Sequence, residues 1–348
     1  MAYISFKPTD YFNTILYTGT GSSNVKTGVG FTPDFVWLKS RSNAQKHCLF
    51  DTVRGVTKTV YSDNDAAEVT EAQLITAFGA DGYTLGTDSD INGNTWTYAG
   101  WNWKAGTTTG KTTSGETITP SSYSINPTSG IGMYAYTGTG ANGTIAHGLS
   151  SAPKFIMVKR LDVAGNWMCG GSIVGTGLSY NNLNNIGPKY DNATIWNSTL
   201  PSSTVISIGT YGATNTNLST YMLYAFSDIK GFASFGKYQG NASATNSPYL
   251  YTGFEPAMLI IKRIDGSDGW TLWDNKRSTY NLRNKFFTPD TYEVEQTGST
   301  DHVVDFLSNG FKIRGSGGET NTNGGNYLYM AWAAEPIVGS NGTAGVAR

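Results

Sequence analysis

Apolar residues along the chain form one pattern that occurs three times. In each copy a proline is followed by a continuous apolar run that ends at a lysine. The three copies are GFTPDFVWLKSR (Gly30–Arg41), LSSAPKFIMVKR (Leu149–Arg160) and TGFEPAMLIIKR (Thr252–Arg263). Apolar residues without alternation predict a central strand that is buried on both faces. We expect the prolines at the start of these strands, where a missing N–H group is tolerated; they are Pro33, Pro153 and Pro256.

Further strands are predicted around each run. Two hairpins are indicated by Asp81-Gly82 and Asn309-Gly310, because these dipeptides readily adopt the positive φ angles of a type I′ turn. Each copy then closes on an aromatic strand, and these strands are Thr97–Trp103, Thr220–Phe226 and Asn326–Trp332. Their last residues are aromatic in all three copies, so we assign Trp103, Phe226 and Trp332 to the core.

The pattern predicts an all-β protein of three tandem β-sandwich modules, each with the roughly 100 residues of one two-sheet sandwich. A jelly-roll, concanavalin-like topology is the preferred form. We expect a first module with a short N-terminal arm at residues 1–106, a second at 130–231 and a third at 232–337. A Thr/Ser/Gly-rich linker is predicted at 107–129 and a tail at 338–348. Asp65–Thr76 is at most a short surface helix.

Composition narrows the possible partners. Charged residues make up 14% of the chain and the net charge is −1, with no basic patch to neutralise phosphates. We therefore expect no nucleic-acid partner. No signal peptide and no long apolar segment occur, so we expect synthesis in the cytoplasm and no membrane insertion. No cofactor motif is found, and the histidines (His47, His147 and His302) are interpreted as surface or turn residues because none has zinc-ligand spacing.

A recurring Asp-x-x-Arg element is the first candidate for catalytic chemistry. It occurs as Asp51–Arg54 in the first copy and as Asp274–Arg277 in the third, and the second copy lacks it. The pair could be catalytic, or it could be a structural ion pair that fixes a loop. We favour the structural interpretation, because glycoside hydrolysis needs two opposed carboxyl groups and no second carboxylate recurs with the pair.

Two further candidates concern binding. Asp88, Asp90 and Asn92 reproduce the first half of a calcium loop, although alanine stands where the bidentate glutamate is due. They are weak calcium candidates, and a solvated loop is the alternative. Trp96 and Trp101 are not repeated in the other copies and are speculative candidates for stacking against a sugar. The alternative for them is burial in the core.

Five segments of the first copy carry a resemblance to a known family: YFNTILYTGTG, VGFTPDFVWLKSR, LFDTVRG, FGADGYTLG and YAGWNWKAG. Together they resemble a repeated β-rich module of unknown function in structural proteins of tailed phages of marine bacteria, cyanophages among them. The resemblance implies a virion component, assembled in the host cytoplasm and exposed on the tail or head of the particle. It supplies no catalytic residues.

Three hypotheses about function follow. The first is a non-enzymatic phage virion protein, a tail-fibre, tail-associated or head-associated component whose lectin-like modules contact host surface polysaccharide. The second is a capsid decoration or tail scaffold protein that binds only other virion proteins, with homo-oligomer formation possible in either case. The third is a polysaccharide depolymerase, which the missing carboxylate pair disfavours.

Overall fold

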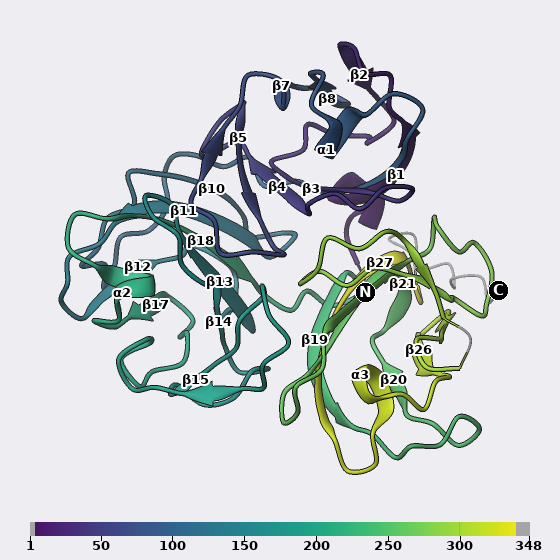
Figure 1. The fold of residues 1–348 in the computed structure, drawn as a ribbon. Coiled ribbons are helices and arrows are strands. Elements are labelled where there is room, and N and C mark those ends of the chain that lie inside the picture. Colours follow the sequence, from purple (N-terminus) through teal and green to yellow (C-terminus); the bar gives the residue numbers. More distant parts are fainter. Residues whose placement is uncertain (1–3, 299, 339–348) are drawn as a thin grey trace.

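The computed structural model describes residues 4–298 and 300–338. Its regular elements are antiparallel strands, together with one short 3₁₀ helix, η1 (Pro8–Asp10), and three one-turn α-helices. The predicted all-β class is therefore confirmed. We describe the strands as unit 1 (β1–β9), unit 2 (β10–β18) and unit 3 (β19–β27), which follow one another along the chain (Figure 1).

Each unit combines a main sheet with smaller sheets. In unit 1 the main sheet has the order β1 (Phe12–Thr18), β9 (Thr97–Trp103), β3 (Phe35–Ser40), β4 (Cys48–Asp51), β5 (Lys58–Tyr61) and β6 (Val69–Thr70). Its second sheet has the order β2 (Asn24–Lys26), β8 (Gly82–Leu85) and β7 (Ile75–Gly79), and α1 is Ser89–Asn92.

In unit 2 the main sheet has the order β10 (Ser122–Asn126), β11 (Ile131–Thr137), β18 (Thr220–Phe226), β13 (Phe155–Arg160) and β14 (Met168–Gly170). Two strand pairs accompany it: β12 (Gly143–Ala146) with β17 (Val205–Ile208), and β15 (Ser179–Tyr180) with β16 (Tyr190–Asp191). The helix α2 is Gly212–Asn215.

In unit 3 the main sheet has the order β19 (Ala233–Gln239), β27 (Asn326–Pro336), β21 (Phe254–Arg263) and β22 (Trp270–Asp274). The second sheet has the order β20 (Tyr249–Tyr251), β26 (Gly310–Ile313) and β25 (Val304–Leu307). A strand pair joins β23 (Lys285–Phe286) to β24 (Gln296–Thr297), and α3 is Gly318–Asn321.

One strand order recurs in the three main sheets: β1-β9-β3-β4, β11-β18-β13-β14 and β19-β27-β21-β22. The register recurs as well, because Phe35, Phe155 and Met258 lie opposite Trp103, Phe226 and Trp332 respectively. Positions in different units can therefore be equated by their place in the ladder. The exact module boundaries given above stay predictions.

The structure differs from the sequence-based prediction in two segments. Within residues 107–129, Ser122–Asn126 form strand β10, which pairs with β11, and Thr107 forms a bridge to Ile125. This segment is therefore not a structureless linker. At Asp65–Thr76 the sequence allowed at most a short surface helix, and the structure instead has β6 and the start of β7.

The prolines mark the central strands in two ways. Pro33 and Pro153 lie two residues before β3 and β13, as predicted. Pro256 lies inside β21, where the pairing with β27 shifts register on both of its sides. The shift lets the ladder accommodate a residue that has no N–H group to donate.

The three units surround a shared aromatic centre. The ring centroid of Trp332 lies 5.3 Å from that of Trp103 and 5.8 Å from that of Phe226. One continuous cluster of buried apolar side chains contains residues of all three units, and Figure 1 shows the units as three lobes around a common middle. Trp103, Phe226 and Trp332 are all buried, and the cluster that contains them is shared by the three units.

Backbone contacts close these lobes into a ring. In unit 1 Arg41 O accepts from Glu295 N of unit 3 at 3.0 Å. The equivalent bonds join Leu161 O to Glu68 N at 2.9 Å and Ile264 O to Lys189 N at 2.8 Å. Each unit is thus bonded to the next in the same way, and every junction of the ring carries one of these bonds.

A buried lysine strengthens each junction. The Nζ atoms of Lys39, Lys159 and Lys262 donate to carbonyl oxygens of the neighbouring unit, those of Tyr292 (3.1 Å), Asp65 (2.9 Å) and Ile186 (3.0 Å). Each also donates to a carbonyl of its own unit. Burial lowers the pKa of each of these lysines to about 8.

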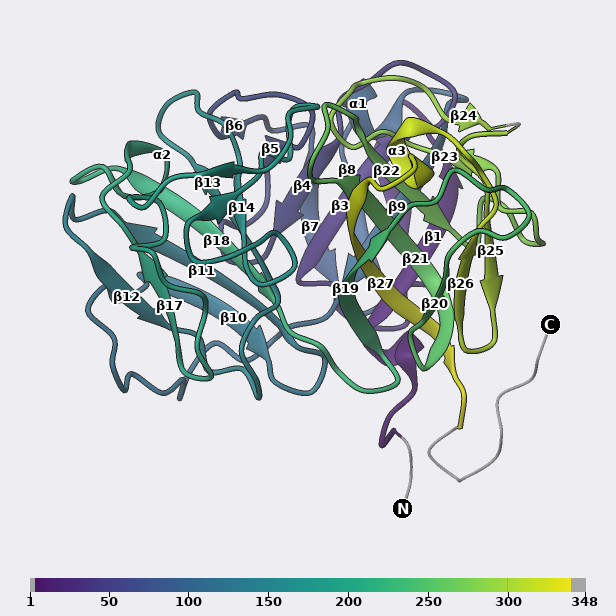
Figure 2. The same cartoon turned by 90° about the horizontal axis from the view of Figure 1, so that it is seen from below.

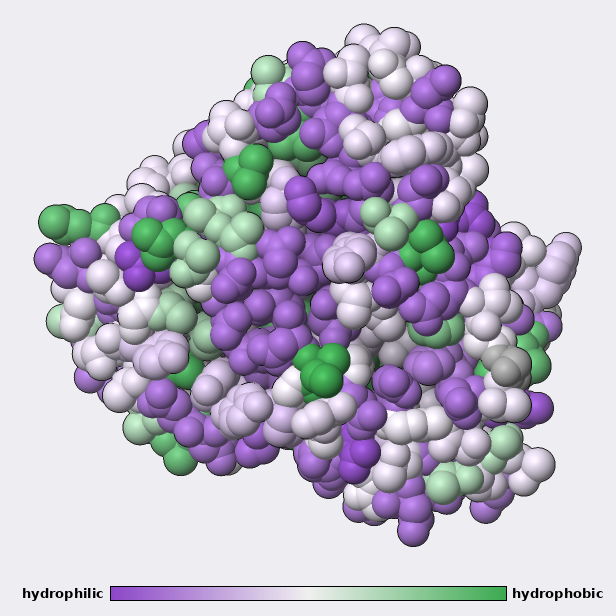
Figure 3. Space-filling model, viewed as in Figure 1, coloured by the Kyte–Doolittle hydropathy of each residue, from purple (hydrophilic) through white to green (hydrophobic). Residues whose placement is uncertain are grey.

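The ring has two different ends. Figure 2 shows that the described chain begins and finishes at one end, while α1 and α3 lie at the other. Figure 3 views the end away from the chain termini, and its surface is mostly hydrophilic with only scattered apolar residues.

Candidate functional site

The Asp-x-x-Arg element is buried at the junctions of the ring. Arg54 Nε lies 2.5 Å from Asp51 Oδ2, and the Tyr224 hydroxyl of unit 2 donates to the same oxygen at 2.7 Å. Both partners of the ion pair are nearly inaccessible to solvent. Burial raises the pKa of Tyr224, so its hydroxyl keeps the proton that it donates.

The second Asp-x-x-Arg pair has the same arrangement at another junction. Arg277 Nε lies 2.5 Å from Asp274 Oδ2, which also accepts from Trp101 Nε1 of unit 1 at 3.1 Å. In unit 2, Gly171 stands at the aspartate position. At this junction the position of the aromatic donor lies in unit 3 and is occupied by Met330, which has no proton to donate. The aspartate and its donor from the neighbouring unit are thus absent together, which explains why one copy lacks the pair.

This geometry corrects the prediction for Trp101. Its side chain is 0% exposed and takes part in the contact with Asp274, so it offers no platform for a sugar. Trp96 is partly buried and packs against the apolar cluster of unit 1. A ligand contact by Trp96 stays a prediction.

The calcium candidates Asp88 and Asn92 make hydrogen bonds to nearby backbone groups. Asp88 caps α1 by accepting from Asp90 N at 2.7 Å. Asn92 is 0% exposed; its Oδ1 accepts from Thr20 N at 2.9 Å and its Nδ2 donates to Gly86 O at 2.6 Å. Equivalent asparagines in units 2 and 3 bond to the backbone in the same way; they are Asn215 and Asn321. Among the described residues, no group of three or more His, Cys, Asp or Glu side chains could hold a metal ion.

Two histidines are core residues and not the surface residues that the sequence suggested. His47 and His147 are both 0% exposed. His47 Nδ1 accepts from Trp37 Nε1 at 3.0 Å, which places the remaining proton of the neutral ring on Nε2. Burial lowers the pKa of His47, so the ring stays neutral.

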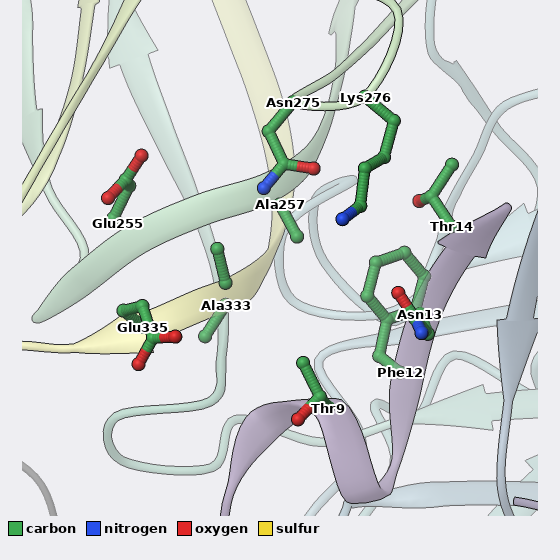
Figure 4. A pocket seen from close by; sticks show the side chains of 11 residues that line it. Thr9, Phe12, Asn13, Thr14, Glu255, Ala257, Asn275, Lys276, Ala333 and Glu335 are labelled. Atoms are coloured by element: carbon green, nitrogen blue, oxygen red, sulfur yellow. The ribbon is translucent and has the colours of Figure 1, made fainter. Parts of the chain in front are cut away.

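A cavity of about 170 Å³ lies at the junction of units 1 and 3. Phe12, Ala257 and Ala333 supply apolar walls, and polar side chains from both units complete the lining. These polar residues are Thr9, Asn13, Thr14, Glu255, Asn275, Lys276 and Glu335. In Figure 4 the side chains of Asn275 and Lys276 reach from the loop after β22 towards the space above Phe12.

Two polar atoms at this cavity have no hydrogen-bond partner within the protein. Thr14 is only 4% exposed, and its Oγ1 is buried without a partner. Asn275 Oδ1 is likewise buried and unpartnered. A buried hydroxyl or amide without a partner costs roughly 1–3 kcal/mol, so these two groups are unusual positions in the structure.

The ladder shows why a cavity forms at this junction. Thr14 lies opposite Trp101, and its equivalents in the other units are Met133, opposite Tyr224, and Phe235, opposite Met330. Both equivalents are buried apolar side chains. A smaller and polar side chain thus replaces an apolar one in unit 1.

The opposite wall shows the same replacement. The residues after Asp274 are Asn275 and Lys276, whereas the corresponding residues after Asp51 are Thr52 and Val53. The unit 2 counterparts are Ser172 and Ile173. Position 276 is thus charged in unit 3 and apolar in both other units.

The main chain holds this wall in place. Asn275 N donates to Ala257 O at 2.9 Å, and the preceding residue, Asp274, is fixed by Arg277 and Trp101. The buried Asp-x-x-Arg pair therefore positions the two residues that face the cavity. Sequence reasoning missed Thr14, Asn275 and Lys276, although aligning the three copies shows polar residues at positions that are apolar elsewhere.

The cavity lining includes three charged side chains. Glu255 and Glu335 lie opposite each other on β21 and β27. An Arg283 nitrogen lies 3.8 Å from the Glu255 carboxylate, and Lys276 brings a positive charge to the lining. The lining itself thus contains two carboxylates and one ammonium group, and Arg283 lies behind Glu255 outside the lining.

These features define an all-β protein whose antiparallel main sheets contribute to one shared apolar cluster, beside further clusters within units 1 and 2. No helix in the described part of the chain is long and apolar enough to cross a membrane. The chain belongs to the family described as a domain of unknown function (DUF7483), which matches residues 7–336. This match runs through all three units as one domain, in agreement with the shared core. A search of curated proteins finds no match.

Proposed function

We propose that this protein is a non-enzymatic structural component of a tailed-phage particle, displayed on the particle surface, where it contacts host polysaccharide. The observation that carries the proposal is the closed ring with two unlike ends. One end holds both termini of the described chain, and the other presents a hydrophilic surface made of loops (Figures 2 and 3). Such a body can attach by one end and expose the other.

Composition and resemblance support the same function. A chain with 14% charged residues and many glycine, threonine and asparagine residues has a nearly neutral surface rich in hydroxyl and amide groups. Such a surface suits contacts with sugars in salt water, where charge-based contacts are screened. The five segments of the first copy that resemble phage structural proteins point to a virion as the setting.

The non-enzymatic part of the proposal is supported by the burial of the Asp-x-x-Arg pairs. Both carboxylates are held in ion pairs with side-chain exposures of 0–2%, where a polysaccharide cannot reach them. Incubation of the protein with capsular polysaccharide and lipopolysaccharide of the host tests this part. We expect no new reducing ends, and their appearance with time would show that the protein is an enzyme.

Localisation tests the virion assignment. Particles of the phage that encodes this chain are purified, probed with antibodies against the recombinant protein and imaged by electron microscopy. We expect antibody on the surface of intact particles, at the tail or the head. Absence of the protein from purified particles would refute the proposal, whereas a surface protein that binds no host glycan would support a decoration or scaffold role.

A further inference from the structure

The cavity between units 1 and 3 has the features of a ligand subsite. We propose that it binds one uncharged six-membered sugar ring, and this inference rests on the proposed function of contacting polysaccharide. The proposal follows from the size of the space and the polarity of its lining.

Size restricts the ligand to one ring. Sites for drug-sized ligands usually measure about 300–1,000 Å³. A cavity of about 150 Å³ in another protein accommodates benzene, which is a single six-membered ring. The space of about 170 Å³ here is therefore suited to one pyranose and is too small for several linked sugars inside it.

Polarity selects a sugar over an apolar ring. Phe12 and Ala333 provide an apolar surface for the C–H face of a pyranose. Thr14 and Asn275 come from opposite units, and each adds a polar side chain to the lining. An apolar ligand would desolvate this polar lining without supplying hydrogen bonds, which is costly.

The two other junctions have apolar residues at the positions that correspond to the polar residues of this cavity. At positions equivalent to Thr14 the chain has Met133 and Phe235, and at positions equivalent to Lys276 it has Val53 and Ile173. These four side chains are apolar. Unit 1 has a polar residue on one side of the cavity and unit 3 has a charged residue on the other side, where the other units have apolar residues. A junction with only a structural role would not require both replacements.

The test measures binding of single sugars to the full chain. Glucose, galactose, mannose, N-acetylglucosamine and rhamnose are each added at about 50 mM, and saturation-transfer NMR and titration calorimetry record binding. We expect at least one of them to bind with a millimolar Kd, as a small ligand with few contacts does. If none of the five binds, the proposal is wrong and the cavity holds water only.

Variants locate the site. Thr14→Met introduces the residue that unit 2 has at this position, and it should weaken binding at least tenfold by filling the space. Asn275→Ala removes the second unpartnered group without filling the cavity, so it tests the same point if Thr14→Met fails to fold. The matched control is Leu16→Met, on the same strand but outside the cavity lining, and it should bind like the wild type.

The outcomes separate this inference from the proposed function. Sugar binding that is unchanged in both cavity variants would place the sugar elsewhere and refute the subsite, while the proposed contact with host polysaccharide would stand. If the variants lose sugar binding, the subsite is supported. If the protein is also absent from purified particles, the virion assignment is refuted while the subsite stands.

Discussion

Replacing Lys159 by methionine should remove a specific pH dependence from the stability of the ring. The Lys159 ammonium donates to Asp65 O at 2.9 Å in unit 1 and to Gly165 O at 2.5 Å in its own unit. Burial lowers its pKa from 10.5 to about 8. Methionine keeps most of the length of the side chain and removes both the donor and the titrating group.

The sign and the size follow from the two pKa values. Between about pH 8 and 10.5 the unfolded chain keeps a proton that the folded chain has released, so the free energy of unfolding rises with pH in this window. Integration from pH 7.5 to 9.5 gives about 2 kcal/mol for this lysine. The Lys159→Met protein lacks this contribution. The difference in the free energy of unfolding between the wild type and the variant should therefore be about 2 kcal/mol larger at pH 9.5 than at pH 7.5.

Guanidinium denaturation followed by circular dichroism at both pH values measures this difference. The other two junction lysines titrate in both proteins, so their effect cancels in the comparison. Lys46→Met is the control, because the Lys46 side chain is 48% exposed, and its effect should be the same at both pH values. An equal effect of Lys159→Met at pH 7.5 and 9.5 would refute the view that this lysine is a desolvated junction donor.

Three further variants test other parts of the structure. Tyr224→Phe removes the donor to Asp51 and should cost about 1.5–3 kcal/mol in the free energy of unfolding, and a cost below about 0.5 kcal/mol would argue against that junction contact. Trp103→Ala removes a ring from the shared centre and should cost about 3–5 kcal/mol by denaturation; a two-step transition in the wild type would contradict a single shared core. Asn92→Ala leaves backbone groups unsatisfied and should cost about 1–3 kcal/mol, whereas a melting temperature of the wild type that rises with added calcium would restore the metal-site interpretation.

Local elements of the fold were predictable from the sequence because they depend on local patterns. The continuous apolar runs became central strands, and Gly82 and Gly310 lie at the hairpins that their dipeptides predicted. The aromatic residues at the ends of the closing strands entered the core, because a position that stays aromatic in three copies behaves as a packing position.

Contacts between units were not predictable in the same way. Lysine donors reach carbonyl oxygens, such as that of Tyr292, and any residue type carries a carbonyl, so the sequence holds no signal for the acceptor. Trp101 was a speculative candidate for sugar contact because it is not repeated, yet its indole donates to Asp274 of another unit. The cavity left a weak signal, since Thr14 and Lys276 replace apolar residues of the other copies.

Small-angle X-ray scattering of the monomer tests the central claim, that the chain closes into one ring with a shared core. A compact chain of 348 residues should have a radius of gyration of about 20 Å. Three separate modules in a row, each with a radius of gyration of about 13 Å, would give about 28 Å or more. A value near 20 Å is the result that we predict, and a value near 28 Å would contradict the closed ring together with the junction cavity that depends on it.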